Sequence, residues 1–279
     1  MKRVVGVTMV VLAGAIALPP ATLRAASLRP ATLLGWHAYV HATEARIARE
    51  LESDAGFLAQ DFAPSPDTDR RSLMSGHVGI VRVSTPGADG DAIAVPEGMV
   101  HHWRGSVFIP GASVDRVLAR VANPGPGDVA QDDVIALRVL DRGPGSLRLF
   151  LRLQRSQIVT VVYNTEHAVQ YTRHGDGRAT SRSVATRIAE VAAPATPDEW
   201  ERPLGEDRGF LWGLNSYWRY EQVRGGVLVE CESISLSRAV PSLVRGAVRP
   251  LVDQVARGSM ERTLLAMRAR FAGRPSQGD

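Results

Sequence analysis

Two glutamates, Glu230 and Glu232, are the residues of this 279-residue chain best spaced for acid–base chemistry. They lie two positions apart in a β-branched run, so on a strand their carboxylates would share one face and could act as a general acid and base. The competing interpretation is a solvated outer face, on which Arg219 and Tyr217 of the preceding run oppose the two glutamates as cross-strand pairs. We favour the solvated face and therefore predict no catalytic residue.

The histidines offer a weaker case for a metal site. His37 and His41 are four residues apart with Glu44 close behind, and two histidines at this spacing on a helix can share a metal ion. The other interpretation, which we adopt, places them on an exposed helical face. His101 and His102 are adjacent in a predicted strand, so their side chains point to opposite faces. The sequence also lacks HExxH, GxSxG, a Walker-type loop and paired cysteines, so we predict neither a metal nor a cofactor.

The two glutamates belong to a predicted β-hairpin whose register follows from its turn. Arg224-Gly225 supplies the glycine that a two-residue turn needs, between the β-branched and aromatic runs Trp212–Glu221 and Val227–Leu236. A slip by one residue would move the charged side chains of one strand to the face opposite their partners. The predicted pairs are Gln222 with Val227, Tyr220 with Val229, Arg219 with Glu230, Trp218 with Cys231 and Tyr217 with Glu232.

One face of this hairpin is apolar and carries large rings, and a C-terminal helix is predicted to cover it. Gly258-Ser259 precedes a helical repeat of Met, Leu and Phe residues that ends at Phe271. Rings and flexible thioethers that face one another accept an apolar ligand, although a filled core would use the same residues. The single cysteine has no disulfide partner in the chain and serves as a small apolar residue. The predicted ligand-binding residues are Trp212, Trp218, Tyr220, Val229, Cys231, Met260, Leu264 and Met267.

Hydrophobic periodicity orders the rest of the chain. An apolar repeat that includes Trp36, Tyr39 and Ile47 predicts an amphipathic helix over residues 35–53. Later segments alternate apolar and polar residues, which predicts an antiparallel meander and an α+β class. The other predicted elements are strands at 78–83, 100–109, 134–140, 147–153, 157–171 and 179–191, a short helix capped by Ser113 and a helical region over 243–271.

This order of elements resembles the START-like, or SRPBCC, superfamily, which includes lipid-transfer proteins and polyketide cyclases. The segments that carry the resemblance are Val100–Gly111, Asn215–Tyr220 and Glu230–Leu236, and it spans residues 75–272. It implies a helix-grip fold, in which a curved antiparallel sheet wraps a long C-terminal helix around a cavity. The chain looks similar to exported bacterial members of uncharacterised activity, so the resemblance bears on fold more than on function.

The first residues predict export. Lys2 and Arg3 precede the apolar run Val4–Leu18 and the small-residue stretch Ala25–Ser27, which is the layout of a secretory signal. The run is short for a membrane span, and the segment is either cleaved or kept as an anchor. We therefore predict a periplasmic location. The predicted division is a signal or anchor at 1–27, a helix and loop at 28–74, the helix-grip domain at 75–272 and a disordered tail at 273–279.

Charge argues against nucleic acid as a partner. Three of the 33 basic residues lie within the first 27 positions, which hold no acidic residue, so 30 basic residues face 29 acidic ones in the remainder. The arginines are scattered rather than clustered. The predicted partner is a hydrophobic small molecule or lipid, with contact at a membrane surface, and the oligomeric state is left open.

Three functions are compatible with these features. The first, which we favour, is binding or carriage of a hydrophobic small molecule or lipid in the cell envelope. The second, implied by the resemblance, is an aromatase/cyclase-like or hydrolase-like enzyme that uses His102 or the glutamate pair as acid or base. The third is a structural or partner-binding envelope protein with a filled core. The space between the sheet and residues 259–271 distinguishes the third function from the other two.

Overall fold

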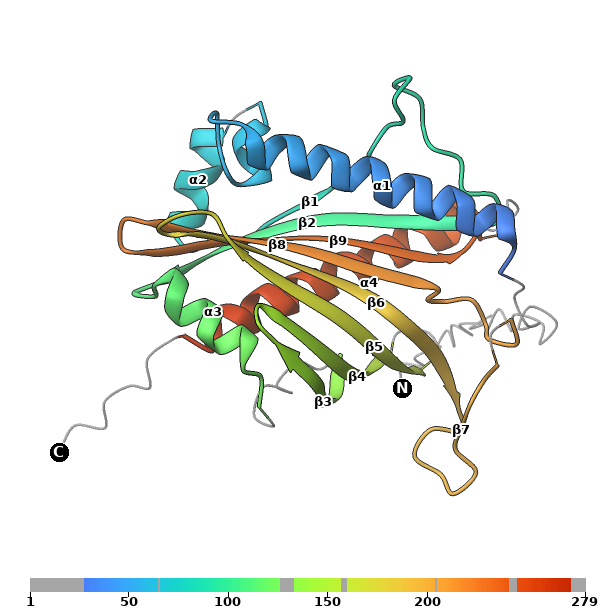
Figure 1. The fold of residues 1–279 in the computed structure, drawn as a ribbon. Coiled ribbons are helices and arrows are strands. Elements are labelled where there is room, and N and C mark those ends of the chain that lie inside the picture. The colour runs from blue at the N-terminus through green and yellow to red at the C-terminus, as the bar shows by residue number, and fades with distance from the viewer. Residues whose placement is uncertain are drawn as a thin grey trace, which may run out of the picture.

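The computed structural model describes residues 28–64, 66–125, 133–156, 160–203, 205–240 and 245–271. The predicted signal at 1–27 and tail at 273–279 lie outside these ranges. Within the described ranges, nine strands form one curved antiparallel sheet (Figure 1). Their order across the sheet is β1-β2-β9-β8-β6-β5-β4-β3, and the short β7 pairs with β6. The strands are β1 Gly79–Arg82, β2 Gly98–Pro110, β3 Val134–Gly143, β4 Ser146–Ser156, β5 Thr160–Arg173, β6 Arg178–Ala192, β7 Trp200–Glu201, β8 Gly213–Val223 and β9 Gly226–Arg238.

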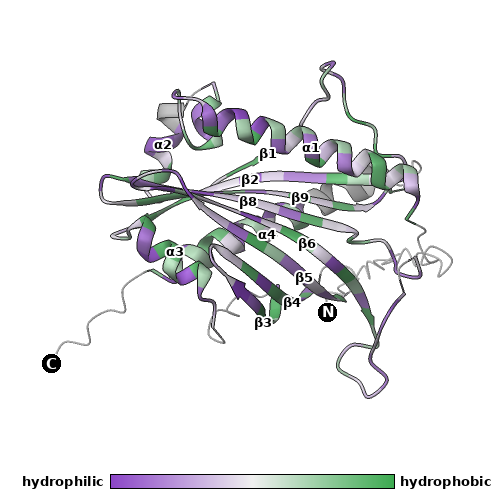
Figure 2. Ribbon diagram, in the orientation of Figure 1, coloured by the Kyte–Doolittle hydropathy of each residue, from purple (hydrophilic) through white to green (hydrophobic). Residues whose placement is uncertain are grey.

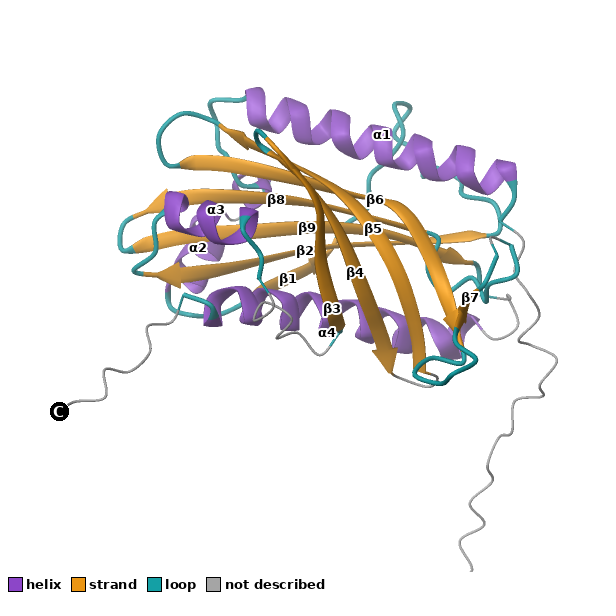
Figure 3. Cartoon of the chain, turned by 60° about the horizontal axis from the view of Figure 1, so that its bottom comes forward, coloured by secondary structure: helices purple, strands orange, loops and turns teal. Residues whose placement is uncertain are grey.

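Helices cover both faces of the sheet. The helix α1 runs along one face, which we call the back face, and α4 runs along the other, which we call the inner face (Figures 1 and 3). The short helix α3 lies at one end of the inner face, beside the C-terminal part of α4. The predicted α+β, helix-grip architecture is therefore confirmed. The helices are α1 Pro30–Glu52, the 3-10 turn η2 Ala59–Phe62, α2 Pro66–Met74, α3 Val114–Ala122 and α4 Arg245–Ala269.

The N-terminal helix is confirmed and is longer than predicted. It starts at Pro30. Proline is favourable at the first helical position because it has no N–H that needs an acceptor. The helix buries Trp36 and Tyr39 against the sheet. The predicted cap of α3 is also confirmed, since Ser113 Oγ accepts a hydrogen bond of 3.2 Å from the backbone N–H of Arg116.

The predicted hairpin is formed by β8 and β9 in the predicted register. Trp218 pairs with Cys231, and Arg219 pairs with Glu230. Gly225 has a φ of 85°, a backbone conformation that glycine adopts without strain, so the turn needs it. Each strand therefore presents alternate residues to the two faces, and polar and apolar residues both occur along the strands (Figure 2).

The expectation of a solvated face around the glutamates is wrong. The side chains of Arg219, Glu230 and Glu232 are only 3%, 1% and 3% exposed. The helix α1 and the turn η2 cover them and supply their polar partners: Glu50 binds Arg219, and the backbone N–H of Ala59 donates to Glu230. A charged strand face can be buried when another element satisfies its hydrogen bonds, and the hairpin alone does not reveal that element.

One glycine lets α4 lie directly on the sheet. A Cβ at Gly105, in the middle of β2, would come within 2.5 Å of Leu264 Cδ1 and 2.8 Å of Met260 Cγ. Glycine inside a strand often marks such a close approach. We expect Gly105→Val to lower the free energy of unfolding by about 1–3 kcal/mol through overpacking. Urea denaturation measures this loss, and an unchanged value would contradict the contact between α4 and β2.

Candidate ligand-binding face

The helix α4 contacts both sides of the curved sheet. On one side, β2 meets α4 at Gly105, as described above. On the other side, Asp133 immediately before β3 accepts hydrogen bonds of 2.8 Å from Ser259 Oγ and from Arg262 Nη2 on α4. The strands β9, β8, β6, β5 and β4 lie between these two contacts, and Figure 3 shows them curving over α4.

The end of the inner face near α3 is a filled core. Buried side chains of β2, β8, β9, α3 and α4 form one cluster there, which includes Val107 of β2 and Val114, Val117 and Leu118 of α3. In this cluster the ring of Tyr220 is 2% exposed, and Leu264 is fully buried. Burial also raises the pKa of the Cys231 thiol well above its usual value, so the cysteine is an apolar packing residue. The predicted ligand-binding residues in this cluster are Tyr220, Val229, Cys231, Met260, Leu264 and Met267.

The middle of the inner face is only partly covered. Along the central strand β8, the inner-face residues Leu214, Ser216 and Trp218 are half-buried, whereas Tyr217 and Arg219 on the back face of the same strand are buried. The ring of Trp218 stacks on that of Tyr220 with 6.4 Å between centroids and 5° between planes. The central strand is thus more fully covered on its back face than on its inner face, where these three side chains remain partly accessible.

One predicted site residue does not lie on the inner face. Trp212 packs against the cluster beneath α1 that contains Trp36 and Tyr217. Its indole Nε1 donates a hydrogen bond of 2.9 Å to Asp207. Trp212 precedes β8, which begins at Gly213, so the alternation of the strand does not fix the side on which this ring lies.

A row of hydroxyl groups crosses the inner face, and the sequence prediction of the site did not include it. Ser183 of β6 pairs with Ser216 of β8, which pairs with Ser233 of β9. On β5, His167 Nδ1 is 3.5 Å from Ser183 Oγ, and its Nε2 is 3.0 Å from Thr165 Oγ1. Burial lowers the pKa of His167 to about 4, so its ring is neutral at pH 7. The sequence carries a signal for this row, because serine occurs at inner-face positions of adjacent strands.

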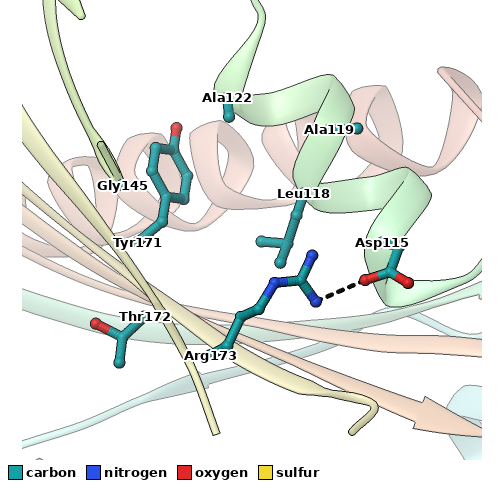
Figure 4. Close-up of a pocket in the computed structure, with 8 residues that line it drawn as sticks. All are labelled: Asp115, Leu118, Ala119, Ala122, Gly145, Tyr171, Thr172 and Arg173. Atoms are coloured by element: carbon teal, nitrogen blue, oxygen red, sulfur yellow. Dashed lines mark hydrogen bonds and ion pairs between the residues drawn. The ribbon is translucent and has the colours of Figure 1, made fainter. Parts of the chain in front are cut away.

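A separate hollow of about 410 Å³ lies between α3 and β5 (Figure 4). Leu118, Ala119 and Ala122 of α3 line one side of it. On the other side, Arg173 of β5 forms an ion pair of 2.6 Å with Asp115. Tyr171 of β5 also lines the hollow, and its hydroxyl donates a hydrogen bond of 3.0 Å to the carbonyl of Val121. These two contacts hold α3 against the sheet at the filled end of the inner face.

The acid–base candidates lie on the back face. His102 Nδ1 is 2.9 Å from the hydroxyl of Tyr39, and its Nε2 is 2.6 Å from Glu232 Oε1. Arg46 of α1 also binds Glu232. Burial raises the pKa of Glu232, but the hydrogen bond and charge of His102 and the charge of Arg46 outweigh it, so the net pKa is lowered. A ligand on the inner face is separated from these groups by the sheet itself.

Glu230 is held in the same layer by different partners. Its carboxylate accepts hydrogen bonds from the backbone N–H groups of Ala59 at 2.7 Å and Gln60 at 3.1 Å. Burial raises the pKa of Glu230, although the nearby guanidinium groups of Arg219 and Arg104 partly counteract the rise. The glutamate pair thus anchors η2 and α1 to the sheet, and its geometry is that of a structural connection.

The histidines considered for a metal site lie elsewhere. His37 and His41 are exposed on α1, and the described residues contain no group of three or more His, Cys, Asp and Glu side chains arranged to hold a metal ion. Among the described helices, none combines the length and the apolar composition that crossing a membrane requires.

No protein-family model and no curated protein matches this chain. Solved structures with a similar fold include a STAR-related lipid transfer protein from Xanthomonas axonopodis, with a TM-score of 0.45, 18% identity and coverage of 70% of this chain and 99% of that one. The Zhui aromatase/cyclase from Streptomyces sp. R1128 has a TM-score of 0.40, 13% identity and coverage of 65% and 100%. The lipid transfer and protein localization domain of human StarD13 has a TM-score of 0.41, 11% identity and coverage of 72% and 94%.

Proposed function

Taking the START-like helix-grip fold as the premise, we propose that this protein binds and carries a hydrophobic small molecule or lipid between the inner face and α4. The observation that carries the proposal is the incomplete cover of β8: Leu214, Ser216 and Trp218 stay half-buried although they lie on a central strand of the sheet. Protein interiors are close-packed, so partly covered apolar side chains at such a position favour a bound guest.

The size of the driving force supports this function. Burying about 400 Å² of apolar ligand surface contributes roughly 10 kcal/mol before the cost of association, at about 25 cal/mol per Å². Association and ordering offset several kcal/mol of this, which leaves affinities of about micromolar. Contacts with a few aromatic and aliphatic side chains are therefore sufficient for carriage without a covalent step.

A direct test is to purify the protein, extract it with organic solvent and analyse the extract for lipids, then titrate the emptied protein with a fluorescent fatty acid or sterol. We expect saturable binding of at least one such probe. A protein that is purified without any lipid and also ignores both probes would contradict the proposal.

Filling the open part of the inner face distinguishes a carrier from a protein with a packed core. We expect Ser216→Phe to abolish probe binding and to change the free energy of unfolding by no more than about 1 kcal/mol, because the ring enters unfilled space. Cys231→Phe is the matched control, since the same ring at a filled position on the adjacent strand should cost about 3 kcal/mol. An equal loss of stability in both variants, measured by urea denaturation, would show that the core is filled.

We also propose that the carrier works outside the cytoplasm, in the periplasm. The support is the basic, apolar and small-residue order of residues 2–27. Expression of the full chain followed by cell fractionation tests this. If the full chain stayed in the cytoplasm, as a variant lacking residues 2–27 should, the proposal would be contradicted.

A further inference from the structure

Ser183, Ser216 and Ser233 form a serine row across the inner face. We propose that the inner face selects ligands that place an uncharged hydrogen-bonding group on this row, such as a hydroxyl or an ester or ketone carbonyl. This inference rests on the proposed function and specifies its ligand: an apolar body with a neutral polar group, in preference to a fatty-acid anion or a cationic amphiphile.

The first observation is that the three hydroxyl groups can address one ligand group together. Ser183 pairs with Ser216, and Ser216 pairs with Ser233, so they occupy adjacent positions on three neighbouring strands. Side chains directly opposite one another in antiparallel strands have Cβ atoms about 5 Å apart, so the row spans about 10 Å. A single hydroxyl or carbonyl group bound above Ser216 therefore lies within reach of two serines.

The second observation is that two of these hydroxyls have no hydrogen-bond partner among the described residues. Ser216 and Ser233 are half-buried, and neither side chain forms a hydrogen bond within the described part of the chain. The indole N–H of Trp103, which pairs with Ser233 across β2 and β9, is buried and also has no partner there. Polar groups in an apolar setting gain free energy from a partner, so these positions favour a ligand that donates or accepts a hydrogen bond.

The third observation is that the inner-face positions described on β8 and β9 offer no charge to an ionic ligand. His167 is neutral at pH 7 because burial lowers its pKa to about 4. Among the charged side chains described nearby, Glu190 binds Arg208 at 2.6 Å, and Asp133 binds Arg262 at 2.8 Å. The inner-face positions described on β8 and β9 are all uncharged, namely Leu214, Ser216, Trp218, Tyr220, Gln222, Val227, Val229, Cys231, Ser233, Ser235 and Ser237.

These observations predict a clear order among ligands of equal chain length. An ionic head group moved from water onto this face loses its hydration and meets no opposite charge on β8 or β9, which is far more costly than desolvating a hydroxyl. A hydroxyl head group instead completes the hydrogen bonds of Ser216 and Ser233. The preference should therefore follow the charge of the head group, since the hydrophobic contribution is the same for each ligand.

The test measures displacement of the neutral apolar dye N-phenyl-1-naphthylamine from the full chain at pH 8 by 1-dodecanol, dodecanoate and dodecyltrimethylammonium. We expect 1-dodecanol to displace the dye at concentrations at least about tenfold lower than either ion. In the double variant Ser216→Ala/Ser233→Ala, we expect the affinity for 1-dodecanol to fall about tenfold relative to the affinity for the dye, as the loss of one or two hydrogen bonds predicts. Ser106→Ala is the matched control, because Ser106 lies on the back face, where its hydroxyl is 3.4 Å from Glu230.

The outcomes separate this inference from the proposed function. If neither the dye nor any amphiphile binds, the proposed carrier function fails. If the dye binds but dodecanoate or dodecyltrimethylammonium matches 1-dodecanol, carriage stands and the selectivity is refuted. The selectivity is equally refuted if the double variant keeps the full advantage of the alcohol, or if Ser106→Ala loses it to the same extent.

Discussion

Glu230→Ala is expected to lower the free energy of unfolding by about 3–5 kcal/mol, the range seen when one member of a buried charged network is removed. The substitution deletes the acceptor for the buried N–H groups of Ala59 and Gln60. It also leaves Arg219, whose Nε lies 4.0 Å from the carboxylate, without that counter-charge. Urea denaturation followed by far-UV circular dichroism measures the loss.

Two further variants make this prediction specific. Glu230→Gln keeps an acceptor oxygen and removes a charge that burial disfavours, so we expect it to lose less stability than the alanine variant. Glu97→Ala is the control, because its ion pair with Arg29 is exposed and should contribute no more than about 1 kcal/mol. If Glu230→Ala behaved like Glu97→Ala, the contact of η2 with the sheet would be refuted.

Acid should destabilise the protein through His167. The pKa of a histidine side chain is ordinarily 6.5, and that of His167 falls to about 4 in the folded protein because the ring is buried. Below pH 6.5 the unfolded chain therefore takes up a proton that the folded protein does not. The contribution of His167 to the free energy of unfolding is fully present above pH 6.5. It is lost as the pH falls from 6.5 to about 4, and the total loss is about 3 kcal/mol.

The measurement compares the free energy of unfolding at pH 7, 5.5 and 4.5 in the original chain and in His167→Gln. The difference in the free energy of unfolding between the two proteins should change across this pH range, because the glutamine cannot titrate. Other acidic groups, such as Glu232 with its lowered pKa, affect both proteins equally and cancel. A His167→Gln profile parallel to that of the original chain would contradict the prediction.

The sequence predicted those features of the fold that depend on neighbouring residues. Gly225 determines the turn, and the alternation of the flanking runs then places Trp218 opposite Cys231, as observed. The caps and apolar repeats likewise predicted α1 and α3. The helix-grip arrangement was expected from the resemblance of this order of elements to the START-like superfamily.

The features that the sequence did not predict depend on contacts between distant segments. Glu230 and Glu232 look like a solvated pair within the hairpin, and only the docking of α1 and η2 buries them. The candidate site shifted for a related reason. Tyr220 and Met267 fill the core because α3 packs beside them, which leaves Ser216 and Trp218 as the partly covered positions.

The contact of the N-terminal segment with the back face also constrains how the chain can fold. The hydrogen bond from Ala59 to Glu230 joins residues that are 171 positions apart, and Arg46 reaches Glu232 across 186 positions. Such non-local contacts are slow to form because a long loop must close first. During synthesis, the contacts of the first segment with Glu230 and Glu232 cannot form until the last hairpin has emerged from the ribosome. The layer on the back face is therefore completed only late in synthesis, and the segments that it joins must stay accessible until then.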